Sequence, residues 1–297
     1  MSTAQAPAVA VSEPRVRERR RKRRRQGQSP WIWVAVIAII IFCLFPFYWL
    51  INVSLKSGAD LSSSSLVPPH PTLKNYRSIF HNDDFTNGLK NSAIVAFSVT
   101  ILSLVVGSFA AYALARLKLR GKFIILGIVL SVTTFPQIAI AAPLFKLWTD
   151  IGLYNTRIGL IIPYLTFALP LAIYILVSFF REIPKDLEEA ALVDGATHFQ
   201  AFRKVVVPLA APGLATAGIL TFIAAWNEFL LATTLTSSKA ARTVPAAIAF
   251  FTGSTEFEQP LGTIAAASVT ISIPLIILVL LFQKRIVAGL TAGAVKG

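Results

Sequence analysis

Residues Glu189 to Pro208 read EAALVDGATHFQAFRKVVVP, and this polar run lies between two long apolar segments, Ile158–Phe180 and Ala210–Ala232. Each apolar segment has about 20 residues, the length that an α-helix needs to cross a hydrocarbon core of roughly 30 Å. The polar run is too short to form a domain of its own. It therefore connects two membrane spans and presents a small structured element to water.

The chain contains four more apolar segments of this kind. None of the six segments contains Lys or Arg, although the 297-residue chain has 28 of these residues. The other four segments are Trp31–Val53, Ser92–Leu114, Phe123–Ala142 and Thr263–Gln283. Inside lipid every backbone polar group must be bonded within its own segment, which favours helices. We therefore predict an all-α membrane protein with six transmembrane helices.

The distribution of basic residues predicts the orientation. With both termini in the cytoplasm, the inner segments hold 20 of the 28 Lys and Arg residues, and the outer loops hold the other eight. The inner segments are 1–30, 115–122, 181–209 and 284–297, and the outer loops are 54–91, 143–157 and 233–262. This asymmetry follows the positive-inside rule and predicts a multi-pass protein with cytoplasmic termini.

A strongly basic run, RERRRKRRR, precedes the first span at residues 17–25. Such runs also occur in nucleic-acid-binding proteins. Directly before a membrane span, the run is instead expected to meet anionic lipid headgroups and to fix the topology. We therefore expect a disordered basic cytoplasmic tail at 1–29, a transmembrane domain at 30–297, and no nucleic-acid partner.

The inner loop 181–209 carries signals for two short helices. Pro184 suits the first position of a helix, and Gly195 suits its end. Thr197 and Gln200 have the spacing of a capping box, which predicts a second helix that Pro208 ends. The loop is thus predicted to fold as helix, glycine elbow, helix.

The charges of this loop indicate what it contacts. One interpretation is a helix pair that lies passively on the membrane surface. Its first arm, however, carries Asp186, Glu188 and Glu189, which anionic headgroups would repel. We therefore favour docking to a soluble partner.

The spacing in this loop resembles the EAA loop of ABC importer permeases. Glu189-Ala190-Ala191 is followed after three residues by Gly195, and after nine more by Val205-Val206-Val207-Pro208, where the family commonly has Ile and Leu at the first and third of these positions. The resemblance implies a type I importer permease fold whose loop docks in a cleft of a cytoplasmic ATPase. It implies the coupling residues Glu189, Ala190, Ala191, Asp194, Gly195, Phe202 and Pro208.

Three further segments resemble the carbohydrate-import branch of this family, and residues 168–297 look closest to the trehalose-importer permeases. The segments are NYRSIF at 75–80, AWNEFLLA at 225–232 and GLTAGAVKG at 289–297. This branch implies a heterodimer with a second, homologous permease. It also implies that the C-terminal tail, 284–297, contacts the ATPase dimer through Gly289, Leu290, Thr291, Gly293, Lys296 and Gly297.

The chain lacks a nucleotide-binding sequence of its own. Gly121-Lys122 has no preceding glycine at the P-loop spacing and is followed by Phe123. We therefore expect no enzymatic activity and no cofactor on this chain, with ATP and Mg²⁺ on the partner ATPase. Cys43 is the only cysteine, and the three histidines stand apart, so no metal site is expected.

Glu228 is the only acidic residue within the six apolar segments. An intramembrane carboxylate is a candidate functional group, which makes Trp226, Asn227 and Glu228 candidate cavity-lining residues. The alternative is that Glu228 snorkels to the nearby outer surface. In the outer loop 233–262, Phe250, Phe251 and Gly253 are candidate contacts for an extracytoplasmic binding protein, although packing onto neighbouring spans is an equal alternative.

We therefore expect a permease subunit of an ATP-driven, binding-protein-dependent sugar importer in a bacterial plasma (inner) membrane. The resemblance implies a disaccharide cargo, with trehalose first and a maltose-like sugar second. The alternative is an ion-coupled secondary sugar transporter, which requires several buried ionisable residues where this chain offers one. A simple membrane anchor would explain the loop but not the proline-rich spans.

Overall fold

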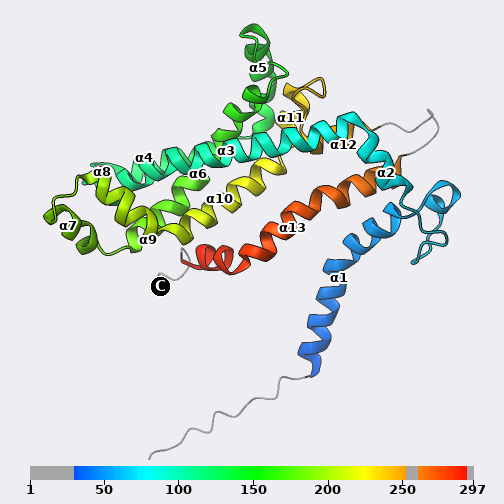
Figure 1. Ribbon diagram of the computed structural model, residues 1–297, viewed down its shortest axis with the longest axis horizontal. Coiled ribbons are helices and arrows are strands. Elements are labelled where there is room, and N and C mark those ends of the chain that lie inside the picture. Colours follow the sequence, from blue (N-terminus) through cyan, green and yellow to red (C-terminus); the bar gives the residue numbers. More distant parts are fainter. Residues whose placement is uncertain (1–29, 252–259, 293–297) are drawn as a thin grey trace, which may run out of the picture. The chain divides into compact units, whose positions relative to one another are not determined.

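The structure is a computed structural model that describes residues 30–251 and 260–292, with the backbone alone for 284–292. All regular secondary structure in these residues is helical, which confirms the all-α prediction for this part of the chain (Figure 1). The chain falls into two units, residues 1–45 and residues 46–297, and the boundary lies inside the first helix.

The elements occur in the order α1 Pro30–Ser54, the 3-10 turn η1 Gly58–Ser62, α2 Lys74–His81, α3 Asp83–Arg116, α4 Lys122–Ser131, the 3-10 turn η2 Val132–Thr134, α5 Gln137–Asp150, α6 Arg157–Glu182, α7 Lys185–Val193, α8 His198–Ala201, the π-helical turn η3 Phe202–Val206, α9 Val207–Leu209, α10 Ala211–Trp226, α11 Leu230–Leu235, α12 Val244–Ala249 and α13 Leu261–Ala292.

The described part of the first unit is the N-terminal part of α1. Its side chains are exposed around the whole helix, including Trp31, Ile39 and Phe42. A helix that is apolar on every side has no polar face to turn toward water. This composition suits a helix surrounded by lipid.

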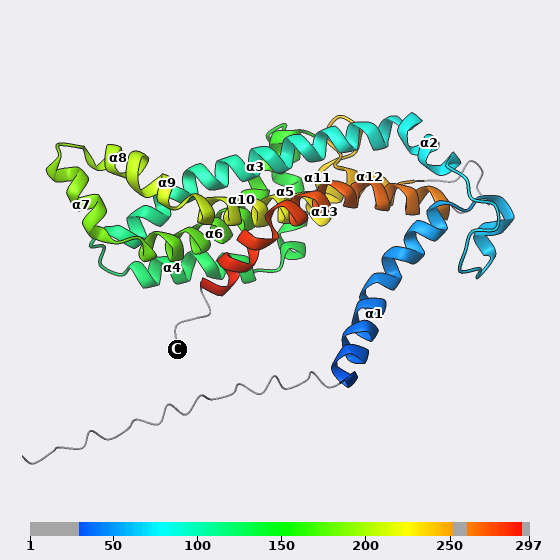
Figure 2. The ribbon, with the colours of Figure 1, turned by 60° about the horizontal axis from the view of Figure 1, so that its bottom comes forward.

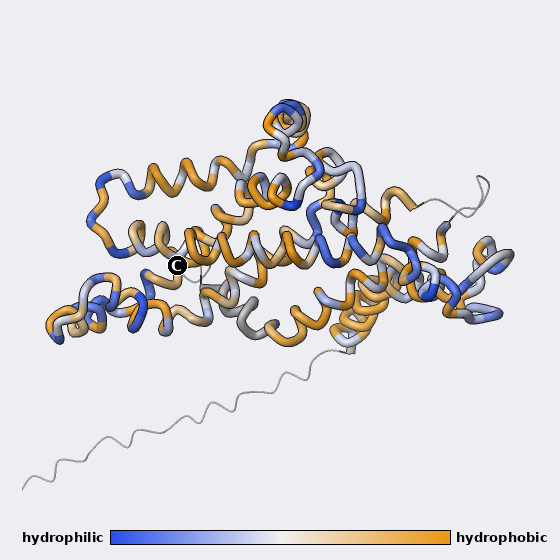
Figure 3. Tube along the Cα trace, turned by 45° about the horizontal axis from the view of Figure 1, so that its top comes forward, coloured by the Kyte–Doolittle hydropathy of each residue, from blue (hydrophilic) through white to orange (hydrophobic). Residues whose placement is uncertain are grey.

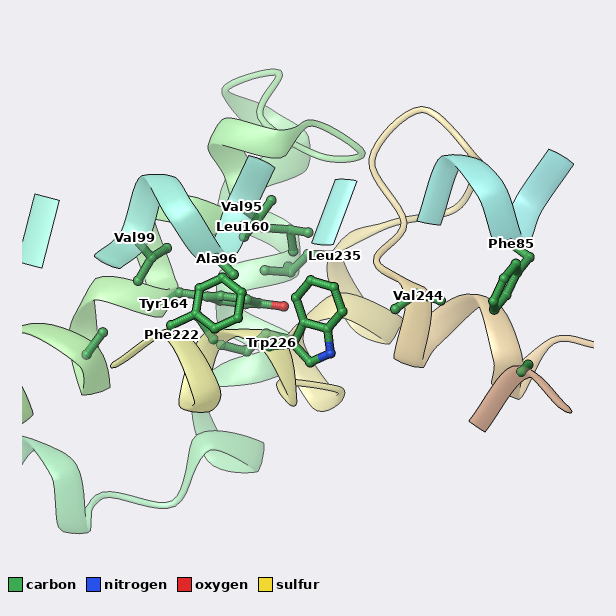
Figure 4. Close-up of a cluster of buried hydrophobic side chains, with 14 of the residues drawn as sticks. Phe85, Val95, Ala96, Val99, Leu160, Tyr164, Phe222, Trp226, Leu235 and Val244 are labelled. Atoms are coloured by element: carbon green, nitrogen blue, oxygen red, sulfur yellow. The ribbon is translucent and has the colours of Figure 1, made fainter. Parts of the chain in front are cut away.

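The second unit is a helical bundle in which α3, α6 and α10 pack against one another (Figures 1 and 2). One buried cluster joins these helices in the half of the bundle nearer α12, and Figure 4 shows Tyr164, Phe222 and Trp226 gathered within it. A second cluster, around Leu176 and Phe202, lies toward α7 and α8. The bundle therefore has two apolar cores along its length.

Within the described residues, four helices are long and apolar enough to cross a membrane: α1, α3, α6 and the part of α13 up to Gln283. Two pairs of helical segments meet the same test only together, and each pair is sharply bent. The count is six if each bent pair is one span. The predicted count of six is met in this sense, but two of the six are not continuous helices, and one bent pair includes residues 198–209 of the predicted inner loop.

The predicted span Phe123–Ala142 is the first correction. The helix breaks at Phe135 and Pro136, and the segments on either side meet at 84°. Pro136 has no N–H to donate, and its ring disfavours the helical conformation at Phe135, which is extended. The apolar run thus continues where the helix does not.

The predicted span Ala210–Ala232 is the second correction. α10 bends by 75° away from the segment that precedes it, at Ala210, and it ends at Trp226. Residues 227–229 are not helical, and α11 starts at Leu230. This span therefore consists of one helix of 16 residues and a separate short helix.

Several polar connections of the second unit lie at its two ends (Figures 1 and 3). α7 and α8 lie at one end with the turn between α3 and α4, and α2 and α12 lie at the other (Figures 1 and 2). Figure 3 shows hydrophilic residues at these ends and largely hydrophobic helices between them. The predicted inner loops 115–122 and 181–209 thus lie at the opposite end from the elements α2 and α12 of two predicted outer loops, whereas the connection between α5 and α6 lies apart from both ends (Figure 1).

Candidate functional site

The loop 181–209 folds as two short helical arms around Gly195. The first arm is α7, which begins at Lys185, one residue later than predicted, and Pro184 is its N-cap residue, with φ −56° and ψ 134°. Asp186 and Glu188 lie in its first turn, where negative charge is favourable. The second arm runs from α8 through η3 to α9.

Gly195 ends the first arm in the way that its sequence predicts. Its φ of +87° is in the left-handed region. The N–H of Ala196 donates to the carbonyl of Ala191 at 3.0 Å, and the N–H of Gly195 donates to that of Leu192 at 3.1 Å. These two bonds form a Schellman motif, which favours glycine at this position because a Cβ is disfavoured there.

The predicted capping box at the start of the second arm is confirmed. The N–H of Gln200 donates to Thr197 Oγ1 at 3.2 Å, and the N–H of Thr197 donates to Gln200 Oε1 at 2.8 Å. The two caps on either side of Ala196 leave almost no free chain at the elbow. The angle between the arms is therefore set by the backbone bonds of the first cap and the side-chain-to-backbone bonds of the second.

The end of the second arm differs from the prediction. Pro208 does not end the helix, which continues to Leu209. Just before Pro208, the chain makes a π-helical turn, in which the N–H of Val207 donates to the carbonyl of Phe202. A π turn shifts the hydrogen-bond register, and it lies directly before the residue that has no N–H. The bend at Ala210 then follows.

A buried ion pair fastens the first arm to the end of α3. Arg116 Nε lies 3.4 Å from Glu188 Oε2, and the two side chains are 5% and 11% exposed. The Tyr112 hydroxyl donates to the same carboxylate, and Arg116 also donates to the carbonyl of Ile183 at 2.8 Å. The sequence predicts only the charges of Glu188 and Arg116, and not this contact between them.

The second arm is fastened by an aromatic cluster. Phe202 is 6% exposed, and its ring lies 4.9 Å from Tyr112, 5.3 Å from Phe109 and 6.3 Å from Phe180, measured between ring centroids. These partners belong to α3 and α6. Phe202, expected from the family resemblance to act in coupling, thus packs inward and holds the second arm to the bundle.

The exposed surface of the two arms carries most of the other predicted coupling residues. Glu189, Ala190, Asp194, Gly195 and Pro208 are exposed, and Ala191 is half-buried. Large apolar side chains are exposed beside them, with Val193 87%, Phe199 57% and Leu187 45% exposed. A groove of about 190 Å³ between the end of α3 and the arms is lined in part by Lys118, Glu189 and His198. An exposed surface that combines apolar side chains with acids suits a protein partner better than water or lipid.

The structure places Trp226, Asn227 and Glu228 at the end of α10. Trp226 is buried and stacks on Phe222, with 5.5 Å between ring centroids. The exposed Asn227 side chain donates to the carbonyl of Ile223 at 3.0 Å. These two side chains therefore serve packing and the end of the helix.

Glu228 does not snorkel to the outer surface, because its residue is 7% exposed. Its two carboxylate oxygens accept the N–H groups of Leu231 at 2.7 Å and Ala232 at 3.0 Å. The carboxylate thus caps α11, whose first N–H groups have no helical partner. This role explains an acid at this depth without contact with lipid.

The remaining predicted contacts belong to the outer loop 233–262 and to the C-terminal tail. Phe250 is 52% exposed with the Arg242 guanidinium 4.4 Å above its ring, whereas Phe251 packs against the buried cluster near Phe85. Gly253 lies outside the described residues. Gly289, Leu290 and Thr291 fall in the last turns of α13, and Gly293, Lys296, Gly297 and the basic tail at 1–29 lie outside the described residues.

Comparisons with known proteins agree on one family. Residues 103–291 match the binding-protein-dependent transport system inner membrane component family. The chain is 55% identical over 256 residues to the trehalose transport system permease protein SugB of Mycobacterium tuberculosis, across 86% of this chain and 93% of that protein. It is 45% identical over 259 residues to the trehalose/maltose transport system permease protein MalG of Thermococcus litoralis, with coverage of 86% and 93%.

A solved structure shares the fold. The chain is similar to one chain of a bacterial ABC transporter involved in the import of the acidic polysaccharide alginate, with 26% sequence identity and a TM-score of 0.72. The similarity covers 87% of this chain and 98% of that chain. The helical arrangement described above is therefore that of an ABC importer permease.

Proposed function

The chain belongs to the family of binding-protein-dependent transport system inner membrane components, and we propose that it is the permease subunit of an ATP-driven disaccharide importer. SugB is a trehalose permease and MalG is a trehalose/maltose permease, which supports trehalose first and a maltose-like sugar second. The protein is a multi-pass inner membrane protein of this family. The single observation that carries the proposal is the capped elbow at 181–209, which has the exposed face of a docking element.

In this proposal the elbow receives force from the partner ATPase dimer, which binds ATP and Mg²⁺. The exposed side chains of Leu187, Val193 and Phe199 would enter a cleft of the ATPase, and Glu189 would pair with a basic group there. Ala190 and Ala191 allow close approach because their side chains are small. Burial of these apolar side chains would contribute roughly 25 cal/mol per Å².

The anchors described above would transmit the motion. Arg116 and Glu188 tie the first arm to α3, and Phe202 ties the second arm to α3 and α6. Because both arms are held by buried contacts, the elbow moves with the bundle instead of pivoting on a loose hinge. A displacement of the elbow would therefore displace the spans.

Three partners complete the proposal. A second, homologous permease forms a heterodimer with this chain, and the C-terminal residues 289–297 reach toward the ATPase dimer. An extracytoplasmic sugar-binding protein docks on the outer loop 233–262, where Phe250 offers an exposed ring. A bacterial alginate ABC transporter has been solved in complex with a periplasmic protein that holds an alginate pentasaccharide.

The ion-coupled alternative has no comparable support. The relatives and the alginate transporter are components of transport systems of the binding-protein-dependent or ABC kind. The carboxylate that an ion-coupled mechanism would use, Glu228, is occupied by two backbone N–H groups. We therefore propose that the energy comes from ATP on another chain.

The proposal is tested by reconstitution in liposomes. The two permeases, the ATPase and the loaded binding protein should take up trehalose only when ATP is supplied on the ATPase side. Omission of the ATPase, or use of this chain alone with a proton or sodium gradient, should abolish uptake. Gradient-driven uptake by this chain alone would overturn the proposal and favour the secondary transporter.

A further inference from the structure

The break between α4 and α5 opens a cavity that the coupling site does not use. Its volume is about 340 Å³, which lies within the range of roughly 300–1,000 Å³ that is typical of small-molecule sites. Its lining residues include three that carry hydroxyls, one amide and two aromatic rings: Ser131, Thr133, Thr166, Gln137, Phe135 and Phe167. Among the residues that line it, none is charged.

The cavity lies at membrane depth. Thr166 is the tenth residue of the 26-residue helix α6, so it lies about 14 Å from one end of that helix and about 24 Å from the other. The backbone at Phe135 and Pro136 is not helical, and irregular backbone at this depth is tolerated only against protein or in a water-filled space. The cavity therefore faces a protein surface or an aqueous pathway and not the lipid.

The polar groups of the cavity are arranged to accept and to donate. Each hydroxyl already donates to a backbone carbonyl: Ser131 to Ile128 at 2.8 Å, Thr133 to Leu130 at 2.7 Å and Thr166 to Pro163 at 2.6 Å. Their lone pairs remain available as acceptors. The Gln137 amide makes no side-chain hydrogen bond to any described residue, so it can both donate and accept.

The rings of Phe135 and Phe167 give the cavity apolar faces that differ in their exposure. Phe135 is 57% exposed, whereas Phe167 is partly buried and is held against Tyr164, with 5.6 Å between ring centroids. Neutral acceptors, one free amide and aromatic faces match the alternating hydroxyl and C–H surfaces of a sugar ring. The absence of a basic residue in this lining disfavours an acidic sugar.

We propose that the cavity between α4, α5 and α6 is a contact site for a neutral sugar on its way through this subunit. Gln137 hydrogen-bonds the sugar hydroxyls, and Phe135 lies against the face of the sugar ring. This inference rests on the proposed function, because it takes a disaccharide as the cargo. It assigns the contact to this permease, whatever the second permease contributes.

The test uses the complete transporter in liposomes, with trehalose as the probe. A single cysteine replaces Gln137 in a Cys43→Ser background, and a small uncharged thiol reagent labels it during transport. We expect trehalose with its binding protein to slow labelling at Gln137→Cys, and maltose or a non-transported sugar to slow it less. Thr134→Cys is the matched control, because Thr134 ends the preceding turn η2 and does not line the cavity, and its labelling should not respond to sugar.

A second measurement separates this inference from the proposed function. Gln137→Ala should lower the maximal rate of trehalose uptake roughly tenfold, about the effect of one lost hydrogen bond, with unchanged sugar affinity of the binding protein. Full uptake by Gln137→Ala together with sugar-independent labelling would overturn the inference and leave the importer function standing. A cysteine at 137 that reacts in the isolated chain but never in the complex would show that the second permease fills the cavity, which also overturns it. No trehalose uptake by the unaltered complex would instead refute the proposed cargo.

Discussion

Glu188 and Glu189 are neighbours in sequence with opposite environments. Successive residues of a helix point about 100° apart, so one faces α3 while the other faces water. Glu188 is paired with the buried Arg116, and Glu189 is exposed beside the groove. Glu189, the acid of the family motif, is thus accessible to a partner, while Glu188 positions the arm that carries it.

We predict that Glu188→Gln destabilises the protein and uncouples sugar transport from ATP hydrolysis. Gln keeps the size of the side chain and an acceptor for Tyr112, but it leaves the Arg116 charge, 5% exposed, without its partner. Breaking a buried pair costs roughly 3–5 kcal/mol, and the lower end applies here because Glu188 keeps some exposure. The check is thermal unfolding in detergent together with the ratio of sugar transported to ATP hydrolysed.

Glu189→Gln is the matched control for this prediction. Its side chain is exposed, so stability should change by no more than about 0.5 kcal/mol while transport falls. Replacing both partners with apolar residues, Arg116→Met and Glu188→Leu, should restore most of the stability. Equal unfolding temperatures for the two single variants would show that the ion pair does not hold the arm.

Gly195 gives a second prediction, which concerns the backbone alone. A Cβ placed on Gly195 would meet no atom within 4 Å, so only its φ of +87° opposes substitution. Left-handed backbone costs most L-residues roughly 1–2 kcal/mol, with Asn less affected. Uptake by the assembled transporter should therefore be highest for Gly195→Asn, lower for Gly195→Ala and lowest for Gly195→Val. If Asn is worse than the smaller Ala, space at the ATPase and not the backbone decides the effect.

The sequence predicts those residues of the site that form hydrogen bonds with residues close to them in the chain. Gly195, Thr197 and Gln200 form caps with residues a few positions away, so their spacing alone identifies them. The Tyr112–Glu188 contact joins residues 76 positions apart, and nothing local marks either partner. Only the packing of α3 against the arm brings them together.

At the level of elements, hydropathy predicts where apolar segments lie but not where their helices break. Residues 210–232 are apolar enough for a span, yet Glu228 caps a new helix inside that run. Glu228 lies one residue before the N-cap residue Phe229, and Glu is not among the residues that usually cap helices, so the local sequence does not mark the new helix. At Pro208 the sequence predicts a helix end that does not occur, because a π turn precedes this residue and the helix continues past it.

The packing of α10 on α6 gives the third prediction. A Cβ on Gly213 would lie 2.4 Å from Cγ and 2.8 Å from Cβ of Phe179, so Gly213→Ala forces these helices apart. Overpacking of this kind costs roughly 1–3 kcal/mol and should lower the unfolding temperature in detergent. Gly127→Ala is the control, because its Cβ would meet no atom within 4 Å in the helix α4. That change should be neutral or stabilise by up to about 1 kcal/mol. Equal effects of the two changes would contradict the close contact at Gly213.

At the level of the whole second unit, α3 connects the two ends. Its 34 residues form a helix roughly 50 Å long. At one end Arg116 holds the elbow. At the other end Asn91 donates to the carbonyls of Lys239 and Arg242, both at 3.0 Å, and Asp83 pairs with Lys239 at 2.8 Å. One continuous helix is therefore bonded to both the elbow and the outer loop that we assign to the binding protein.

Because α3 is bonded to both the elbow and this outer loop, the coupling proposal depends on the predicted orientation of the chain in the membrane. The chain has one cysteine, so Cys43→Ser gives a background free of thiols. Single cysteines at Val67, Ala240 and Leu119 then report three exposed positions, of which the first two are in predicted outer loops and the third is in the turn between α3 and α4. A membrane-impermeant maleimide should label Val67→Cys and Ala240→Cys in intact cells, and Leu119→Cys only after permeabilisation.

This labelling pattern is expected because 20 of the 28 Lys and Arg residues lie on the side predicted to be cytoplasmic, and the elbow lies at the same end of the second unit as the turn that holds Leu119. Each variant is first shown to be transport-competent, so that labelling reports the native topology. The reverse pattern, with Leu119→Cys alone labelled in intact cells, would place the elbow outside. It would thereby remove the elbow from any cytoplasmic ATPase and refute the coupling proposal together with the topology.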